Sequence, residues 1–176
     1  MRKVLMVLSA AMLTLASCQM KVKNNETEVT STEQTAQNQF TDIALPGPQG
    51  QTVKVSDYIG KNKLVLIDFW ASWCGPCRME MPTVVKAYDL YHEKGLEIVG
   101  VSLDQNKENW TQAISMLGQK WPQMSDLKGW NCEGARLYSI ESIPANVLIN
   151  EKGEIVARDL RGDELLKEIG ARLAAE

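Results

Sequence analysis

Cys74-Gly75-Pro76-Cys77, in the middle of the chain, has the residue types and spacing of a redox-active thiol pair. A cysteine at the start of a helix ionises easily, because the open N–H groups and the positive end of the helix dipole favour an anion. Pro76 is tolerated there, since first-turn N–H groups have no intrahelical partner. With two residues between them, Cys77 lies one turn further on and can close a small disulfide. The pattern predicts thiol–disulfide exchange in which Cys74 attacks a partner's disulfide and Cys77 resolves the mixed intermediate.

The same Cys-x-x-Cys spacing also forms half of many zinc sites. A zinc site would need a second pair of ligands at suitable spacing, and the chain offers only Cys132 and His92 for that purpose. We therefore expect neither a metal site nor a cofactor.

The segment that leads into the cysteines predicts a central strand. Leu64–Trp70 contains seven residues, six of them apolar and β-prone, which is typical of a strand buried on both faces. Asp68 stands in the middle of it, and burial would raise its pKa toward neutrality. One interpretation is a general base that deprotonates Cys77, through a water, during the resolving step. The other is a structural acid that backbone donors or a neighbouring lysine satisfy.

Upstream of this strand we expect a hairpin, and downstream of it the active-site helix. Phe40–Leu45 and Gln51–Val55 are short strand candidates separated by a turn rich in Pro and Gly. The helix should run to about Lys94 and stop at Gly95.

The next elements continue the alternation of strand and helix. Leu96–Leu103 predicts a second buried strand, and Asp104 or Asn106 can cap a helix that reaches about Leu117. Strand, helix, strand and helix in this order indicate a parallel βαβ core with right-handed crossovers. The segment Gly118–Trp130 has no regular pattern.

The C-terminal third predicts two helices and two strands. Asn131–Tyr138 is expected to form a short helical turn, and Ala145–Ile149 and Glu154–Arg158 an antiparallel strand pair. Asp163 is the predicted cap of a final amphipathic helix, Glu164–Ala175.

The sequence DFWASWCGPC (Asp68–Cys77) resembles the active-site segment of the thioredoxin superfamily almost residue for residue. Ile143-Pro144, followed by an apolar run, resembles the cis-proline loop of that family. The continuation CRMEMP (Cys77–Pro82) resembles the TlpA/ResA-like branch of envelope-anchored thioredoxin-like reductases. The resemblance covers residues 40–176 and implies an α/β thioredoxin-like fold: a central mixed β-sheet flanked by helices, with an N-terminal β-hairpin and an inserted segment.

The resemblance also implies roles for residues around the cysteines. Asp68 matches the family's buried acid. Glu80 lies one turn after Cys77 on the same helix face, which implies a role in proton handling or partner choice; the alternative is a solvated surface acid. An apolar groove for an extended substrate segment is expected to comprise five residues: Trp73, Gly75, Pro76, Ile143 and Pro144. The alternative for Trp73 is core packing.

The N-terminus predicts export. Arg2-Lys3 precede a short apolar run, too short for the about 20 residues that span a bilayer, so we expect residues 1–17 to be a signal peptide. Leu15-Ala16-Ser17-Cys18 resembles a lipobox, in which Cys18 is lipidated; the alternative is an ordinary signal peptide with an incidental cysteine. Residues 18–39 would form the lipidated cysteine and a flexible tether, because the segment is polar and lacks aromatic residues up to Gln39.

The net charge of the chain disfavours one class of function, and the cysteine motif indicates another. Removing residues 1–17 changes the net charge from −3 to −5, which disfavours non-specific binding to nucleic acid. We expect a membrane-anchored, periplasm-facing lipoprotein of the cell envelope. It would reduce disulfides of exported proteins, for example in cytochrome c maturation, and a membrane thiol electron donor would recharge it.

Two alternative functions, and the role of one further cysteine, remain open at this point. A peroxiredoxin-like peroxidase is disfavoured because Ala71 and Ile67 stand where peroxiredoxins have Thr or Ser and Pro. A non-catalytic lipoprotein binding module is disfavoured by the intact Cys-Gly-Pro-Cys motif. Cys132 is either simply buried or a regulatory thiol.

Overall fold

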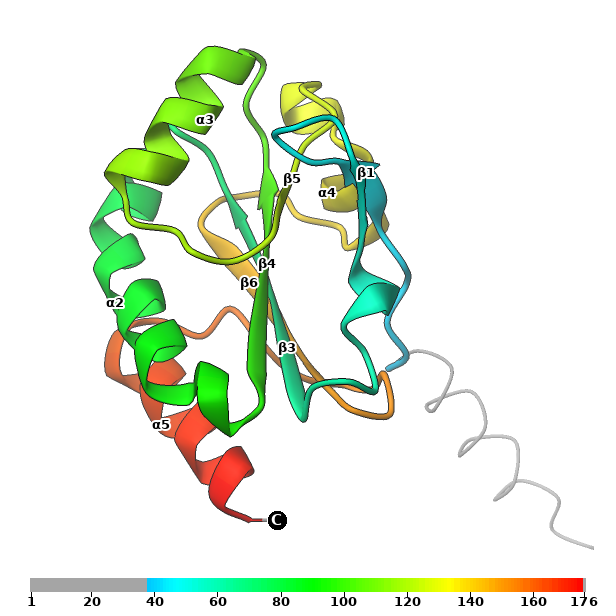
Figure 1. The fold of residues 1–176 in the computed structure, drawn as a ribbon, viewed down its shortest axis with the longest axis vertical. Coiled ribbons are helices and arrows are strands. Elements are labelled where there is room, and N and C mark those ends of the chain that lie inside the picture. The colour runs from blue at the N-terminus through cyan, green and yellow to red at the C-terminus, as the bar shows by residue number, and fades with distance from the viewer. Residues whose placement is uncertain (1–37, 176) are drawn as a thin grey trace, which may run out of the picture.

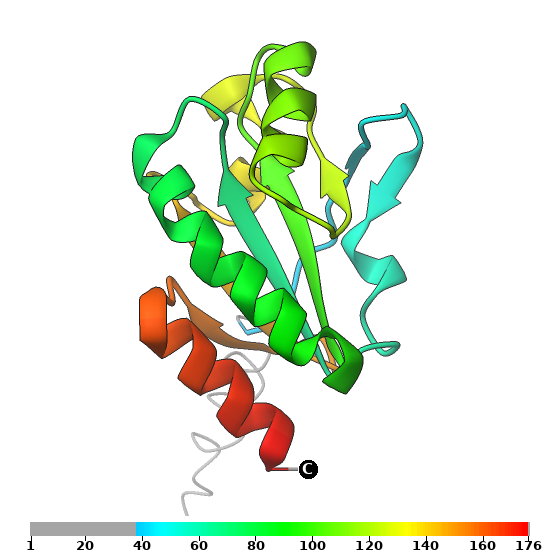
Figure 2. The same ribbon diagram turned by 60° about the vertical axis from the view of Figure 1, so that its left-hand side comes forward.

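A computed structural model of the chain describes residues 38–175. Its centre is a mixed five-stranded sheet. Helices α2 (Gly75–Tyr91), α3 (Lys107–Met116) and α5 (Gly162–Ala174) cover one face of this sheet. The short helix α4 (Glu133–Leu137) lies on the other face together with the N-terminal hairpin (Figures 1 and 2).

The strand order of the sheet is β5-β4-β3-β6-β7. β3 (Leu64–Trp70) pairs in parallel with β4 (Leu96–Ser102), which pairs in parallel with β5 (Gln123–Met124). On its other side β3 pairs antiparallel with β6 (Ala145–Asn150), and β6 with β7 (Ile155–Arg158). The predicted parallel core and the antiparallel C-terminal pair are both confirmed. β5 was not predicted, because a two-residue strand is too short to leave a pattern in the sequence.

The two central strands are buried along their whole length. Every residue of β3 and of β4 is inaccessible or nearly so, as a strand with elements on both faces requires. These apolar runs form the centre of a core to which α2 contributes Met81, Val84 and Ala87.

The predicted hairpin is present but shorter than expected. β1 (Ala44–Pro46) and β2 (Thr52–Lys54) pair antiparallel as a separate two-stranded sheet. The backbone N–H of Gly47 closes the turn on the carbonyl of Gln51 at 2.7 Å.

Helix ends agree with the predictions except at α5. α2 ends at Tyr91 and continues as a 3-10 turn (η2, His92–Lys94) that stops at Gly95, whose φ is 108°. Asn106 caps α3, with its side chain accepting from Asn109 N at 2.8 Å. Two further 3-10 turns are present: η1 (Val55–Asp57) lies between β2 and β3, and η3 (Gly129–Asn131) lies between β5 and α4.

The prediction that Asp163 caps the last helix is wrong. Arg161 is the N-cap of α5, and its side chain makes no capping hydrogen bond within the described residues. The N–H of Gly162, the first residue of the helix, is instead bound by the Glu80 carboxylate of α2 at 2.8 Å. A distant acid thus satisfies this group. Asp163 lies in the first turn of the helix, where its charge faces the positive end of the dipole.

The predicted signal peptide, Cys18 and most of the tether lie outside the described residues. Within residues 38–175 the structure holds no helix that is both long and apolar enough to cross a membrane.

A glycine in β4 leaves space for a buried amide, which yields a test of the fold. A methyl group added at Gly100 would overlap the side chain of Gln123. That buried side chain accepts from Trp70 Nε1 at 3.1 Å and donates to Gln119 Oε1 at 2.5 Å, so it has little freedom to move. We expect Gly100→Ala to lower the free energy of unfolding by about 1–3 kcal/mol in urea denaturation, the usual cost of overpacking. Gly75→Ala, where the methyl would meet open space, is the control; equal stability of both variants would contradict the prediction.

Candidate active site

The two cysteines lie where β3 gives way to α2, and they are joined by a disulfide with an S–S distance of 2.10 Å. Cys74 is the N-cap of α2, and its sulfur accepts a hydrogen bond from Cys77 N at 3.2 Å. Cys74 and Cys77 are 5% and 2% exposed, whereas Gly75 and Pro76 between them are exposed. The sulfur of Cys74 therefore lies at the positive end of a helix, which stabilises a thiolate when the disulfide is open.

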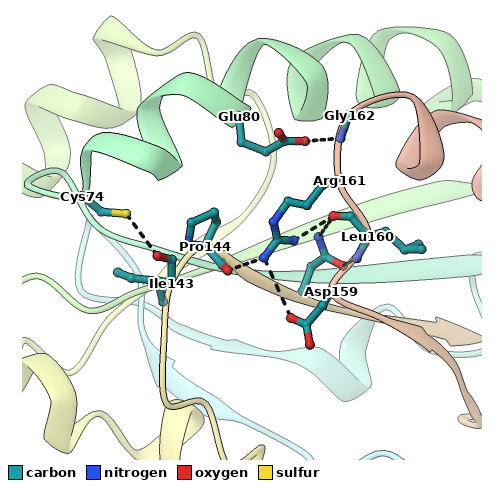
Figure 3. Close-up of polar contacts among 9 residues, drawn as sticks. Cys74, Glu80, Ile143, Pro144, Asp159, Leu160, Arg161 and Gly162 are labelled. Carbon is teal, nitrogen blue, oxygen red and sulfur yellow. Dashed lines mark hydrogen bonds and ion pairs between the residues drawn. The ribbon is translucent and has the colours of Figure 1, made fainter.

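The predicted proline loop faces this sulfur. The Ile143–Pro144 peptide bond is cis, and the carbonyl oxygen of Ile143 lies 3.7 Å from Cys74 Sγ (Figure 3). The loop leads directly into β6, which pairs with β3. The structure thus brings together Cys74 and Ile143, which are 69 residues apart in the sequence.

Trp73 lies on the surface beside the disulfide. It is 55% exposed, so the alternative that it packs in the core is wrong. Its ring centroid is 6.4 Å from that of Trp130, which is 48% exposed and was not predicted as a site residue. Trp73 also borders a cleft of about 290 Å³, which reaches along Arg78 to Met116 and Leu117 of the α3 segment. Exposed aromatic and apolar side chains therefore flank the disulfide.

Asp68 occupies the middle of β3 and is only 3% exposed. Its Oδ2 atom has no hydrogen-bond partner within the described part of the chain. The pKa of Asp68 is raised from 3.8 to about 7; burial is the largest cause, the charge of Arg161 opposes it, and that of Glu80 acts with it. The cation that acts on this acid is thus an arginine, not the lysine that the structural interpretation allowed.

Glu80 lies on α2, three residues after Cys77, as the helix spacing predicted. Its carboxylate accepts from Gly162 N at 2.8 Å. Figure 3 shows the side chain pointing toward the start of α5. The alternative of a freely solvated surface acid is therefore wrong.

Asp104 holds the loop between β3 and α2, a contact that sequence analysis missed. Its buried carboxylate accepts from Ser72 N at 3.0 Å, from Ser72 Oγ at 2.5 Å and from Ser102 Oγ at 2.7 Å. Asp104 had been predicted only as a helix cap, a role that Asn106 takes. Its actual partner is 32 residues earlier in the chain, so no local pattern could have revealed it.

The loop between β7 and α5 was also missed. Arg161 donates to the carbonyl of Pro144, the proline of the cis peptide. Asn146 of β6 holds Leu160 by donating to its carbonyl at 2.8 Å and accepting from its N–H at 3.0 Å. Figure 3 shows Arg161 extended between Pro144 and the backbone at Leu160.

Cys132 is fully buried, and burial raises the pKa of its thiol, so the interpretation of a simply buried cysteine is confirmed. Among residues 38–175, no group of three His, Cys, Asp or Glu side chains is placed to hold a metal ion.

The chain is similar to known proteins over most of its length. Residues 36–158 match the model of the AhpC/TSA family. The sequence is 34% identical over 121 residues to thiol-disulfide oxidoreductase ResA of Halalkalibacterium halodurans. This alignment covers 69% of this chain and 66% of that protein. It is 41% identical over 104 residues to ResA of Oceanobacillus iheyensis, covering 59% of this chain and 52% of that protein. The chain thus spans between about half and two thirds of the length of these curated relatives.

Solved structures show the same fold. The thioredoxin domain of a thiol-disulfide oxidoreductase from Bacteroides vulgatus superimposes with a TM-score of 0.71 at 33% identity, covering 77% of this chain and 95% of that domain. A thiol-disulfide oxidoreductase from Bacteroides fragilis gives 0.70 at 29% identity, covering 76% and 98%. The predicted thioredoxin-like fold, with its mixed sheet and N-terminal hairpin, is confirmed.

The buried acid leads to a prediction about stability and pH. Because folding raises the pKa of Asp68 from 3.8 to about 7, the folded state favours the protonated acid, and stability falls as the pH rises between these two values and levels off above the higher one. We expect Asp68→Asn to raise the free energy of unfolding of the oxidised protein at pH 8.5 by roughly 1–4 kcal/mol, and by less than half as much at pH 5. Urea denaturation at both pH values measures this difference.

Asp57→Asn is the matched control, because Asp57 is an exposed acid in η1 and its loss should change stability little at either pH. A difference between wild type and Asp68→Asn that is the same at pH 5 and pH 8.5 would contradict the raised pKa.

Proposed function

The chain belongs to the AhpC/TSA family, and from this premise we propose that it is a thiol-disulfide oxidoreductase that reduces disulfides of exported proteins. The observation that carries the proposal is the Cys74–Cys77 disulfide at the start of α2, with the carbonyl of the cis-proline loop against Cys74. The names of the curated relatives and of the structural neighbours support the same activity.

The first half of the reaction uses Cys74. Its thiolate, favoured by the helix N-terminus, attacks one sulfur of a substrate disulfide. A bond forms between Cys74 Sγ and that sulfur, and the other substrate sulfur leaves as a thiolate that takes a proton from water. Trp73, Gly75, Pro76 and the Ile143–Pro144 edge would bind the extended substrate segment.

The second half uses Cys77 and Asp68. The Asp68 carboxylate takes the proton of the Cys77 thiol, directly or through a water, and the Cys77 thiolate attacks Cys74 Sγ. The Cys74–Cys77 bond forms, the bond to the substrate breaks, and the second substrate sulfur leaves reduced. A pKa of about 7 suits this base, because it is ionised in part at neutral pH and still accepts a proton readily.

The direction of electron flow and the setting belong to the same proposal. Gly75-Pro76 between the cysteines, the buried Asp68 and Ile143 before the cis-proline favour a reductant. Two electrons leave the protein in each turnover, so a membrane thiol donor must return them. Export through residues 1–17, a lipid on Cys18 and a tether through residue 39 would hold the domain in the envelope, where oxidised cysteines of apocytochrome c are one class of substrate.

The activity is tested by reduction of insulin with dithiothreitol as electron source, and by equilibration of the pair in thiol buffers. We expect a reduction potential near the about −270 mV of thioredoxin rather than the about −120 mV of DsbA. Cys74→Ser should abolish turnover, and Cys77→Ser should accumulate a mixed disulfide through Cys74.

Cys132→Ser is the matched control and should keep full activity, because Cys132 is buried and takes no part in the disulfide. A potential near that of DsbA would reverse the proposed direction. Rapid consumption of peroxide by the reduced protein, without reduction of insulin, would replace the proposal with the peroxidase alternative. Full biological activity of Cys74→Ser would favour the binding module.

The anchor is tested separately by fractionating cells that express the full chain. We expect wild type in the membrane pellet and Cys18→Ser in the soluble fraction, because a thioether-linked lipid is the only attachment proposed. Cys132→Ser should remain in the pellet. Retention of Cys18→Ser with the membranes would refute lipidation as the anchor.

A further inference from the structure

We propose that Arg161 is a positioning residue of the redox centre, whose guanidinium holds the cis-proline loop against Cys74 and supplies positive charge to the buried Asp68 carboxylate. The proposal rests on the proposed thiol-disulfide exchange and deepens it. Arg161 lies between β7 and α5, away from the Cys-x-x-Cys motif in the sequence, and its type and spacing predicted no role.

The backbone around Arg161 is fixed before its side chain makes any contact. Asn146 of β6 holds Leu160 through both its N–H and its carbonyl, and the backbone carbonyl of Asn146 accepts from Asp159 N at 2.9 Å. Asn146 is 2% exposed, so water does not compete for these bonds. The arginine therefore projects from a loop that is anchored to the central sheet.

The guanidinium connects this anchored loop to the proline loop. Arg161 Nη2 donates to the carbonyl of Pro144, and Nη1 donates to the carbonyl of Leu160 at 2.7 Å. Asp159 Oδ1 lies 3.9 Å from Nη2 and balances part of the charge. The planar fork of arginine suits two carbonyls at once, whereas the single ammonium of lysine does not. The residue before Pro144 is Ile143, whose carbonyl faces Cys74 Sγ (Figure 3).

The next residue binds the other side of the site. Gly162 N donates to Glu80 on α2, the helix that carries Cys77. Gly162 has a φ of +50°, a conformation that glycine adopts without strain. Two consecutive residues, Arg161 and Gly162, thus connect the loop that faces Cys74 to the helix that carries Cys77.

Arg161 also provides the positive charge that acts on Asp68. In the sheet register Asp68 lies beside Gly100 of β4 and Asn146 of β6, and neither is charged. From the helical side, Glu80 contributes a negative charge that raises the pKa of Asp68, and Arg161 lowers it. Without Arg161, the carboxylate would hold its proton to a higher pH. A smaller fraction of it would then be ionised and able to accept the proton of Cys77 at neutral pH.

The experiment follows the resolving step directly in the full chain. Reduced protein is mixed with glutathione disulfide, Cys74 forms a mixed disulfide with glutathione, and the rate at which Cys77 releases reduced glutathione is measured from pH 5 to pH 9. We expect Arg161→Met to shift the midpoint of this profile upward by about one pH unit. This is the low end of the pKa shifts that a nearby opposite charge causes, because Arg161 is one-third exposed and water screens its charge. Arg161→Lys should restore most of the midpoint.

A second measurement separates the hydrogen-bonding role from the charge. Both variants lose the fork that holds Pro144, so the KM for insulin should rise about 2- to 10-fold in each, the range for one hydrogen bond. Arg136→Met is the matched control: Arg136 is an exposed arginine of α4, and its loss should change neither the midpoint nor the KM.

Equal pH midpoints for Arg161→Met and Arg136→Met would overturn the proposal. If Arg161→Met does not fold, Arg161→Gln replaces it, and Arg161→Lys still tests the KM. If wild type fails to reduce insulin, the proposed function fails, while the glutathione profile still decides whether Arg161 acts on Asp68.

Discussion

A carboxylate inside a strand that water does not reach is the constraint on which this site depends. Asp68 cannot move to the surface, because β3 is the central strand and is buried along its whole length. An ionised acid there would be costly without compensation. Arg161, from the loop before α5, offsets part of that cost, and Glu80, from α2, adds to it. The result is an acid with a pKa of about 7, neither permanently charged nor permanently neutral. Those two charges come from elements that must be packed correctly for the balance to hold.

The surrounding contacts keep that packing in place from two directions. On the β4 side, Asp104 binds both the backbone and the hydroxyl of Ser72, which fixes the loop that presents Trp73 and Cys74. On the other side, Glu80 of α2 binds the first N–H of α5, so that one side chain both influences Asp68 and caps a neighbouring helix. Displacing α5 would expose a free N–H and a half-buried carboxylate together. Contacts in the loop before α2 and in its second turn thus hold the start of this helix in place. Its own N–H groups remain available to the Cys74 sulfur.

Local sequence was enough to predict the chemistry and most of the elements. Cys74, Cys77 and Asp68 lie within one strand and one helical turn, so strand periodicity and helix-start signals located them, and Pro144 was recognised from the family resemblance. The contacts that sequence missed join distant segments: Ser72 to Asp104 across 32 residues, Trp70 to Gln123 across 53 and Glu80 to Gly162 across 82. A single sequence carries no record of which distant residues meet. The same limit explains the misplaced cap of α5: the helix begins at Gly162, one residue before Asp163, and its first N–H is bound by Glu80 from a distant helix.

The buried acid has a second consequence, which concerns the direction of electron transfer. The helix N-terminus stabilises the Cys74 thiolate and thereby favours the reduced pair, as in oxidants whose reduced form is stabilised. A negative charge at Asp68 acts the other way, because a low-dielectric site does not readily hold a second anion, whereas the Cys74–Cys77 disulfide is neutral. The oxidised form is then favoured, and the pair gives up its electrons more easily. The residue proposed to speed the resolving step would therefore also make the protein a stronger reductant. Arg161, by favouring the ionised form of Asp68, adjusts both properties together, so in this site the rate of resolution and the reduction potential are physically coupled.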